Sequence, residues 1–220
     1  MLNEVYAVWH SYDQIEFSML PNSFALKLNS GFGTNVFVPD ESTADETLVR
    51  GQFKTWIADM RNSNLGHECG YNGIDPRIMA ERLYPRNANN EIPDHKFFCF
   101  DGKVRCLYVM QNYVDNHAKG ELGFFNREFG MLPVRRKDFN AMRAMPQKPV
   151  EFEKMVTCAE TLSRGFPHVR VDFFDIEGKA MFAEMTFYNA SGYTVFDPHE
   201  FDYVLGKEFE LPVVDSRKTT

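Results

Sequence analysis

Two acidic residues, Asp172 and Glu184, occur in a pair of strand-like segments within residues 168–187. Both segments alternate between apolar and polar residues, as half-buried strands do. If the loop between them contains three residues, 177–179, even-numbered positions face each other, and the two carboxylates share a face with Arg170. Like charges opposed across strands repel each other, and a hard divalent cation with oxygen ligands would offset that repulsion. A two-residue loop would instead send the carboxylates to opposite faces.

The alternative is an ordinary solvated strand face. Phe174 and Phe182 fall on the same predicted face as the two acids. Large aromatic side chains at this density are unusual on an open surface. A face that combines polar and aromatic residues is more typical of a pocket wall, so we favour a binding site here.

A lysine beside a glycine-containing turn is the second chemical feature. Lys27 lies in an apolar strand within residues 24–38, and Gly31 and Gly33 lie in the turn that follows it. Glycines allow backbone N–H groups to approach an anion closely, and a nearby lysine adds a positive charge for phosphate oxygens. The alternative is an ordinary hairpin with an exposed lysine. The Gly-Lys-Ser/Thr ending of a Walker P-loop does not occur in the sequence.

Two further strands would position polar side chains. Residues 92–111 contain two apolar segments around Asp101-Gly102, which is the turn chemistry of a hairpin. Asp94 and Lys96 share one face of the first strand, although a charged pair at this place also suits a strand edge that faces solvent. Glu81 stands at the end of another short apolar strand.

Two helices complete the predicted framework. Thr43 and Glu46 have the spacing of a capping box, and the helix after them carries an apolar stripe that we interpret as core. Between Pro149 and Gly165 a second helix leads directly into the paired strands. Its apolar side comprises Met155, Ala159 and Leu162.

Several segments are predicted to be irregular. Residues 61–73 and 112–148 are rich in polar residues and glycine, and residues 213–220 are expected to be loose. His67 and Cys69 lack further ligands nearby, so we interpret this pair as incidental rather than as a metal site.

The overall composition excludes several classes of protein. The chain carries a net charge of −7, whereas a nucleic-acid-binding surface is basic, so we expect no nucleic-acid partner. No apolar run reaches the roughly 20 residues that a membrane-spanning helix needs, and the N-terminus does not read as a secretory signal. The four cysteines lack the paired spacing of a zinc site and indicate reduced thiols. We therefore expect a cytoplasmic protein without an integral membrane segment.

Five pieces of sequence form an ordered set: Lys27 with Gly-Phe-Gly at 31–33, AERLYP at 80–85, PDHKFFCFDGK at 93–103, FPHVRVDFFD at 166–175 and FAEMTFYNASG at 182–192. Together they resemble the ATP-grasp superfamily, and within it the TupA-like branch associated with teichuronopeptide and capsular polysaccharide synthesis. The resemblance runs from Val5 to Leu211. It implies an α+β fold with two subdomains, residues 1–80 and 81–220, whose antiparallel sheets enclose a nucleotide cleft.

The resemblance implies a role for each nucleotide-binding position. Lys27 would reach the phosphates of ATP, and the loop from Gly31 to Gly33 would cover them. Glu81 would line the adenine pocket at a hinge. Asp94 would accept a hydrogen bond from a ribose hydroxyl. Lys96 is the alternative functional residue of that hairpin.

The resemblance also implies a Mg²⁺ site and a reaction. Asp172 and Glu184 would hold the metal ions, with Thr186 and Asn189 as further candidate ligands, and Arg170 would stabilise charge on the transferring phosphoryl group. The implied reaction is carboxylate activation by ATP, followed by attack of an amine on the acyl phosphate. The implied partners are ATP, a carboxylate acceptor such as a uronic-acid polysaccharide or sugar nucleotide, and the amine.

Two departures from the branch leave an alternative open. Asn29-Ser30 stands where the branch tends to have Asn-His, and the further region that the branch carries before Val5 is missing. The alternative function is a non-catalytic ATP-binding module in a polysaccharide-assembly complex, with a protein partner that supplies the missing region. A kinase is disfavoured because the His-Arg-Asp and Asp-Phe-Gly motifs are absent from the sequence. Nothing in the residues indicates a sugar-nucleotide site of a glycosyltransferase.

Overall fold

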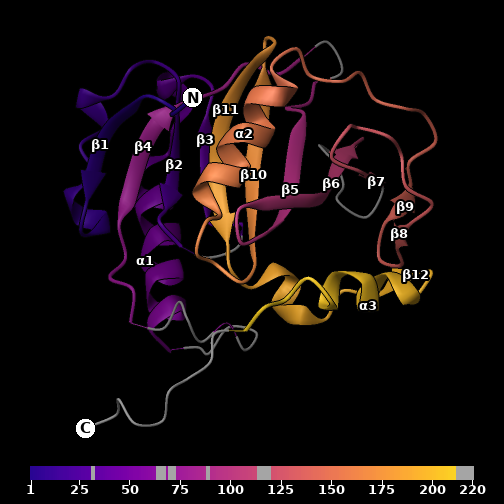
Figure 1. Cartoon of the computed structure of the whole chain (residues 1–220). Coiled ribbons are helices and arrows are strands. Elements are labelled where there is room, and N and C mark those ends of the chain that lie inside the picture. Colours follow the sequence, from indigo (N-terminus) through magenta and orange to yellow (C-terminus); the bar gives the residue numbers. More distant parts are fainter. Residues whose placement is uncertain (31–32, 63–67, 69–72, 88–89, 113–119, 212–220) are drawn as a thin grey trace, which may run out of the picture. The chain divides into compact units, whose positions relative to one another are not determined.

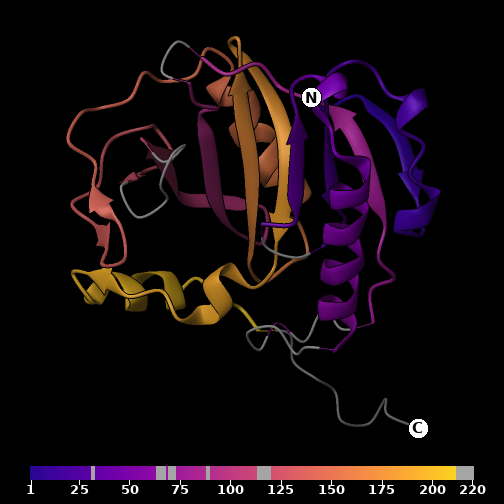
Figure 2. The ribbon, with the colours of Figure 1, turned by 180° about the vertical axis from the view of Figure 1, so that it is seen from behind.

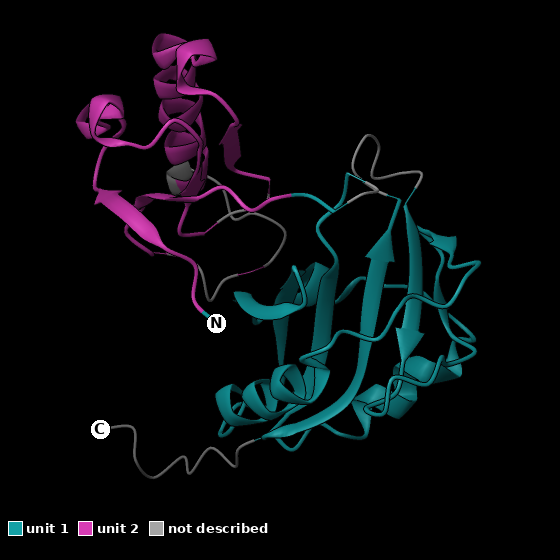
Figure 3. Ribbon diagram, turned by 90° about the horizontal axis from the view of Figure 1, so that it is seen from above, with its two compact units in different colours: residues 1, 86–220 teal, residues 2–85 magenta. Residues whose placement is uncertain are grey.

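The chain forms two compact α+β units (Figures 1 and 3). The computed structural model describes residues 1–30, 33–62, 68, 73–87, 90–112 and 120–211. One unit comprises Leu2–Pro85, and the other comprises Arg86–Thr220 together with Met1. Glu81, which we expected at the start of the second subdomain, belongs to the first unit. The α+β class predicted from the sequence is confirmed.

The first unit is a four-stranded antiparallel sheet with one long helix. The strands lie in the order β1-β4-β2-β3. Their bounds are β1 Val5–Trp9, β2 Phe24–Leu28, β3 Asn35–Val38 and β4 Ile78–Arg82, and the helix is α1, Glu46–Asn62. Phe24, Leu26 and Ile78 from the sheet pack with Phe53 of α1 in a buried core. The predicted hairpin within residues 24–38 is therefore confirmed.

The helix α1 begins with a different cap from the predicted one. Asp45 supplies the cap, because its Oδ1 accepts a hydrogen bond of 2.9 Å from the backbone N–H of Leu48. The hydroxyl of Thr43 instead donates to the carbonyl of Asp40 at 2.7 Å. The capping box of Thr43 and Glu46 is therefore wrong. A carboxylate directly before the first turn serves the same unpaired N–H groups and adds a favourable charge.

The second unit is built on a six-stranded sheet in the order β11-β10-β5-β6-β7-β9. The bounds of these strands are β5 Asp94–Phe100, β6 Lys103–Gln111, β7 Glu121–Phe125, β9 Asn140–Ala141, β10 Val169–Ile176 and β11 Lys179–Thr186. A small ladder pairs β8, Arg135–Arg136, with β12, Phe196–Asp197. The helices are α2, Phe152–Leu162, and α3, Glu200–Gly206, and a 3-10 turn, η7, spans Asn189–Gly192.

The two faces of this sheet have different partners. Helix α2 covers one face, and Figure 2 shows the sheet from the other side, in front of the helix. Met155 and Ala159 of α2 are fully buried against Phe97 and Val171 of the sheet, whereas Leu162 is 40% exposed, contrary to its predicted place on the apolar side. The opposite face carries an aromatic cluster that comprises Phe98, Tyr108, Phe124 and Phe196, among others.

The segment 112–148 contains more structure than we predicted. Its residues 121–125 form β7, a buried strand between β6 and β9, and β8 and β9 follow as two-residue strands. The sequence of β7, Glu-Leu-Gly-Phe-Phe, is too short and too uniformly apolar to show a period of two. Burial on both faces of the sheet removes the alternation that identifies a half-exposed strand.

The turn between β10 and β11 contains two residues, Glu177-Gly178, with φ angles of 52° and 79°. The predicted three-residue loop, 177–179, is therefore wrong. A regular ladder continued from a two-residue turn would place Asp172 opposite Ala183, with Glu184 on the other face.

A β-bulge in β11 corrects this register. Phe173 pairs with Phe182, but the preceding Asp172 pairs with Glu184, so Ala183 is an extra residue. Asp172 and Glu184 therefore share a face in spite of the two-residue turn. Phe182 lies with Phe173 on the opposite face, where their ring centroids are 6.0 Å apart. The expectation that Phe182 interrupts the polar face is wrong.

Candidate active site

Arg170, Asp172 and Glu184 meet on the face of the β10–β11 hairpin that is turned away from α2. Because Arg170 and Asp172 are two residues apart in β10, their side chains point to the same side. The guanidinium of Arg170 contacts both carboxylate oxygens of Asp172, with Nε–Oδ1 at 2.8 Å and Nη2–Oδ2 at 2.7 Å. Its Nη2 also donates to Oε1 of Glu184 at 2.8 Å. Asp172 is completely buried, whereas 58% of the Glu184 side chain is exposed.

Two neutral side chains complete the surroundings of Arg170. Thr186 lies opposite Arg170 in the ladder, and its Oγ1 accepts from Nη2 at 2.9 Å. Asn189 stands at the start of η7, and its Oδ1 accepts from Nη1 at 2.7 Å. The next two residues, Ala190 and Ser191, have φ angles of 47° and 52°, in the left-handed region that side chains rarely adopt. This strained turn directs the chain away from β11 while Asn189 stays in contact with the guanidinium.

Lys96 links a further carboxylate to this group. β5 lies between β10 and β6, so Lys96 is in the interior of the sheet and not at an edge. It pairs with Asp172 in the ladder, and its Nζ lies 2.7 Å from Oδ2 of Asp172 and 2.7 Å from Oδ2 of Asp94. The two cations and three carboxylates form one network, the charged cluster, which comprises Asp94, Lys96, Arg170, Asp172 and Glu184.

Burial and pairing act against each other on the ionisation of the charged cluster. Burial raises the pKa of Asp94 to about 6, although the charge of Lys96 opposes this rise. Burial would also raise the pKa of Asp172, but the charges of Lys96 and Arg170 outweigh it and hold that pKa below its ordinary value. Burial would lower the pKa of Lys96, and the neighbouring Asp172 and Asp94 reverse the effect. Asp172 is therefore the carboxylate that both cations hold ionised.

The oxygen atoms around Arg170 are of the chemical types that a hard cation prefers. Three oxygen atoms, from Asp172, Glu184 and Thr186, lie within 2.7–2.9 Å of one atom, Nη2 of Arg170. Carboxylate, hydroxyl and amide oxygens are the ligands that Mg²⁺ takes, and Asn189 adds an amide oxygen nearby. Among the described residues no group of three or more His, Cys, Asp or Glu side chains is placed to hold an ion. An ion that used these oxygens would therefore compete with the guanidinium of Arg170.

Tyr108 is a member of the site that the sequence did not indicate. Its hydroxyl lies 3.4 Å from Nη1 of Arg170, and burial raises its pKa. It faces Lys96 in the β5–β6 ladder because a second bulge, at Arg105, follows the two-residue turn of that hairpin. Without this bulge the strand partner of Lys96 would be Leu107. The alternation of β6 alone could not have placed Tyr108 at the site.

Lys27 and Glu81 form an ion pair within the first unit. Their strands β2 and β4 are neighbours, and Nζ of Lys27 lies 3.0 Å from Oε1 of Glu81. The second oxygen of Glu81 accepts a 2.7 Å hydrogen bond from the side chain of Asn3. Gly33 has a φ of 69°, a conformation that glycine adopts without strain. The structure thus brings Lys27 together with Glu81, and their roles toward a nucleotide remain predictions.

Some of the predicted features lie outside the described residues. These are Gly31, the pair His67 and Cys69, and residues 213–220. Cys99, Cys106 and Cys158 are free thiols. Within the described ranges, no helix combines the length and the apolar character required to cross a membrane.

The sequence and the fold agree with one class of known proteins. The sequence profile of the TupA-like ATPgrasp family matches residues 4–210, and the chain belongs to this family. The resemblance deduced from the sequence motifs is thereby confirmed. A search of curated proteins finds no match.

Solved structures support the same fold. The crystal structure of D-alanine–D-alanine ligase from Bacillus anthracis superposes with a TM-score of 0.51 at 15% sequence identity, covering 94% of this chain and 60% of the ligase. The structure of that ligase complexed with ATP gives a TM-score of 0.51 at 12% identity, covering 94% of this chain and 58% of the ligase. The chain thus has the ATP-grasp fold and spans about three fifths of the ligase's length.

Proposed function

We propose that this protein is an ATP- and Mg²⁺-dependent ligase that joins a carboxylate to an amine. The observation that carries the proposal is the convergence of Asp172, Glu184 and Thr186 on Arg170 in a chain of the TupA-like ATPgrasp family. The likeness in fold to a D-alanine–D-alanine ligase, one structure of which holds ATP, supports it. The proposed acceptor is a uronic-acid carboxylate of a surface polysaccharide or its precursor, and the proposed setting is the cytoplasm.

The proposed reaction has two steps that balance. A carboxylate oxygen of the acceptor attacks the γ-phosphorus of ATP, and ADP leaves with the electrons of the broken P–O bond. The amine nitrogen then attacks the acyl carbon, phosphate leaves, and the amine loses a proton as the amide forms. Bound Mg²⁺ would neutralise phosphate charge.

The residues of the charged cluster would position reactants and charge. Arg170 is itself about nine-tenths buried, but it lies beside the exposed Glu184 and would stabilise negative charge on the transferring phosphoryl group there. Asp172, with Glu184, Thr186 and Asn189, would hold the metal. Lys96 would keep Asp172 ionised and in place.

The substitution Glu184→Gln gives the sharpest test of this function. Its side chain is 58% exposed, so the folded state should tolerate an amide while the charge for the metal is lost. We expect ADP formation with MgATP, glucuronate and an amine mixture to fall by about a hundredfold or more, since removal of one transition-state contact costs on this order. Glu153→Gln is the matched control, because Glu153 is exposed on α2 and pairs only with the exposed Lys148 in the described structure.

The outcome also separates the ligase from a non-catalytic ATP-binding module. Stabilisation of the wild-type protein by MgATP, without ADP formation for any carboxylate tried, would favour the module. Unchanged ADP formation in Glu184→Gln would refute the metal-binding role of this residue. Asp172→Asn is less decisive on its own, because it leaves Lys96 and Arg170 with an unmatched buried charge and lowers stability.

A further inference from the structure

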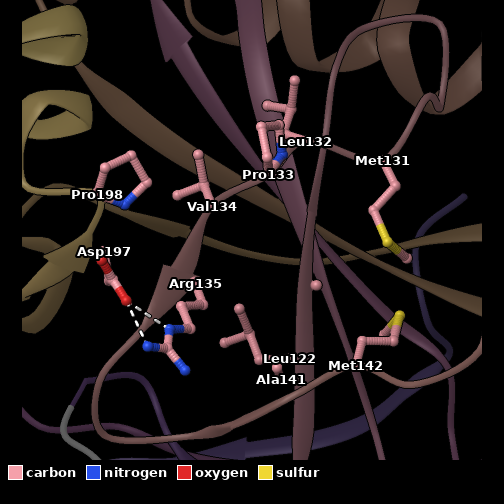
Figure 4. A pocket seen from close by; sticks show the side chains of 11 residues that line it. Leu122, Met131, Leu132, Pro133, Val134, Arg135, Ala141, Met142, Asp197 and Pro198 are labelled. Carbon is pink, nitrogen blue, oxygen red and sulfur yellow. Dashed lines mark hydrogen bonds and ion pairs between the residues drawn. The ribbon is translucent and has the colours of Figure 1, made fainter.

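A cavity of about 330 Å³ lies along the edge of β7 that faces away from β6 (Figure 4). Two segments pair with this edge in opposite directions, one parallel and one antiparallel to β7. The N–H of Met142, directly after β9, donates to the carbonyl of Leu122 at 3.1 Å, and the N–H of Leu132 donates to the carbonyl of Phe124 at 2.8 Å. Because the cavity lies beside Gly123, between these two bonds, backbone pairing defines its walls.

One side of the cavity is apolar. Figure 4 shows Met131 and Met142 at this side, and Leu122 and Leu132 also line the cavity. Met142 can lie this close to β7 because position 123 is a glycine, where an added Cβ would come within 2.9 Å of the methionine sulfur. Methionine side chains adapt to apolar groups of different shapes, so this wall suits an aliphatic side chain.

The other side of the cavity carries an ion pair with unused bonding positions. Nε and Nη2 of Arg135 lie 2.7 Å and 2.5 Å from Asp197, and both dashed lines in Figure 4 end on the same oxygen, Oδ2. Within the described residues, Nη1 of Arg135 and Oδ1 of Asp197 have no partner. The two side chains are 60% and 40% exposed, so a ligand can reach both of them.

The charges of this ion pair cancel, so the cavity selects neither a simple anion nor a simple cation. A zwitterion matches the pair, because its carboxylate can accept from Arg135 while its ammonium group donates to Asp197. An α-amino acid carries both groups on the carbon atom that bears its side chain. With its charged groups at the ion pair, its side chain would extend toward Met131 and Met142.

We propose that this cavity binds a free α-amino acid with an aliphatic side chain of about the size of leucine. The carboxylate bonds to Arg135, the ammonium group bonds to Asp197, and the side chain packs against Met131 and Met142. A volume of about 330 Å³ lies at the lower end of the range for small-molecule sites. The cavity shares no residue with the charged cluster, so this inference does not rest on the proposed ligase function.

Calorimetry with three ligands of related carbon skeleton tests the proposal. The ligands are leucine, 4-methylpentanoate, which lacks the ammonium group, and 3-methylbutylamine, which lacks the carboxylate. We expect leucine to bind about tenfold or more tightly than either analogue, since each analogue loses one charge-assisted hydrogen bond. Glutamate keeps both charged groups of the amino acid, but its side-chain carboxylate would meet the methionines. It should therefore bind about tenfold or more weakly than leucine.

Substitutions in the lining connect this selectivity with the cavity. Arg135→Gln should remove the advantage of leucine over 3-methylbutylamine, and Asp197→Asn should remove its advantage over 4-methylpentanoate. Ala141→Leu, at an exposed position of the lining, should fill the cavity and abolish leucine binding while the ion pair stays intact. Arg143→Gln is the matched control, because Arg143 is 84% exposed and lies outside the lining, and it should leave leucine affinity unchanged.

The outcomes decide the inference without reference to the ligase activity. Absence of leucine binding at millimolar concentration, or equal affinity for leucine and either analogue, would overturn it. Tighter binding of 4-methylpentanoate than of leucine would also overturn it, because the cavity would then select an anion. Unchanged leucine affinity in both Arg135→Gln and Ala141→Leu would place the ligand elsewhere and refute the assigned site. Binding of MgATP and formation of ADP, measured separately, test the proposed function alone.

Discussion

Asp172 and Glu184 lie directly opposite each other in the β10–β11 ladder because Ala183 is an extra residue in β11. The bulge changes which residues share a face, and it does so immediately before Glu184 of the charged cluster. Both carboxylates reach Arg170 only in this register. Bulges at such places commonly redirect a side chain toward a site.

Single-residue deletions test this register. Deleting Ala183 should produce a regular ladder in which Glu184 still opposes Asp172, so the unfolding free energy should fall by no more than about 2 kcal/mol. Deleting Met185 should instead turn Thr186 away from Arg170 and cost more than about 3 kcal/mol, because a buried charge loses contacts. Denaturant unfolding of both variants measures the difference. Equal losses would contradict the assigned role of the bulge.

The buried lysine can be tested by a double-mutant cycle. Lys96→Met leaves Asp94 without its cation and should lower the unfolding free energy by about 3–5 kcal/mol. Adding Asp94→Asn removes the uncompensated charge, so the double variant should recover at least about 1 kcal/mol. Urea denaturation of the wild type, both single variants and the double variant gives the coupling. Strictly additive losses would show that the two side chains do not interact.

The net charge of the charged cluster predicts how tightly it binds a free metal ion. Asp94, Asp172 and Glu184 carry three negative charges, and Lys96 and Arg170 carry two positive ones, which leaves −1 when all are ionised. Replacing Arg170 by Met removes the competing cation and changes the sum to −2. We expect Mn²⁺, followed by electron paramagnetic resonance without nucleotide, to bind about tenfold more tightly.

The control for this measurement is Arg143→Met, because the Arg143 side chain is 84% exposed. Circular dichroism should first establish that the Arg170→Met variant is folded, and Arg170→Lys provides a second variant that keeps the positive charge. Weaker Mn²⁺ binding in Arg170→Met than in the wild type would contradict competition between the guanidinium and the ion.

His95 predicts a dependence of stability on pH. It is buried on the α2 side of β5, and burial lowers its pKa to about 4. The unfolded chain therefore binds more protons than the folded chain between about pH 4 and 6.5, and the contribution of His95 to stability is lost as the pH falls through this window. A shift of this size corresponds to roughly 3 kcal/mol at most.

The variant His95→Phe isolates this contribution. Its ring can occupy the same place near Phe129, and it cannot take up a proton. As the pH falls from 7.5 to 4.5, the unfolding free energy of the wild type should fall more than that of the variant. Parallel pH profiles would show that another group is responsible.

The strands that bear the site, and one of the two hairpin turns between them, followed from local sequence signals. Asp101-Gly102 predicted a two-residue hairpin turn, and the structure has it with φ angles of 40° and 79°. Lys96 and Asp172 were both identified as candidate residues. Their direct contact was not predicted, because it depends on the pairing of β5 with β10, which are far apart in the sequence.

The parts that sequence reasoning missed depend on long-range contacts. The bulges at Ala183 and Arg105 have no glycine or other local marker, so alternation along the strands could not reveal them. Tyr108 entered the site only through the second bulge. The strand β7 was missed because its burial on both faces removes the alternating pattern.

The ion pair between Lys27 and Glu81 determines what an incoming anion encounters in the first unit. Nζ of Lys27 already has a carboxylate at 3.0 Å, and only about a quarter of this side chain is exposed. A phosphate oxygen that reached the ammonium group would exchange one negative neighbour for another, so charge attraction contributes little net affinity there. Anion binding at this position should therefore depend little on ionic strength. Discrimination between nucleotides and other anions there depends on shape and hydrogen-bond direction.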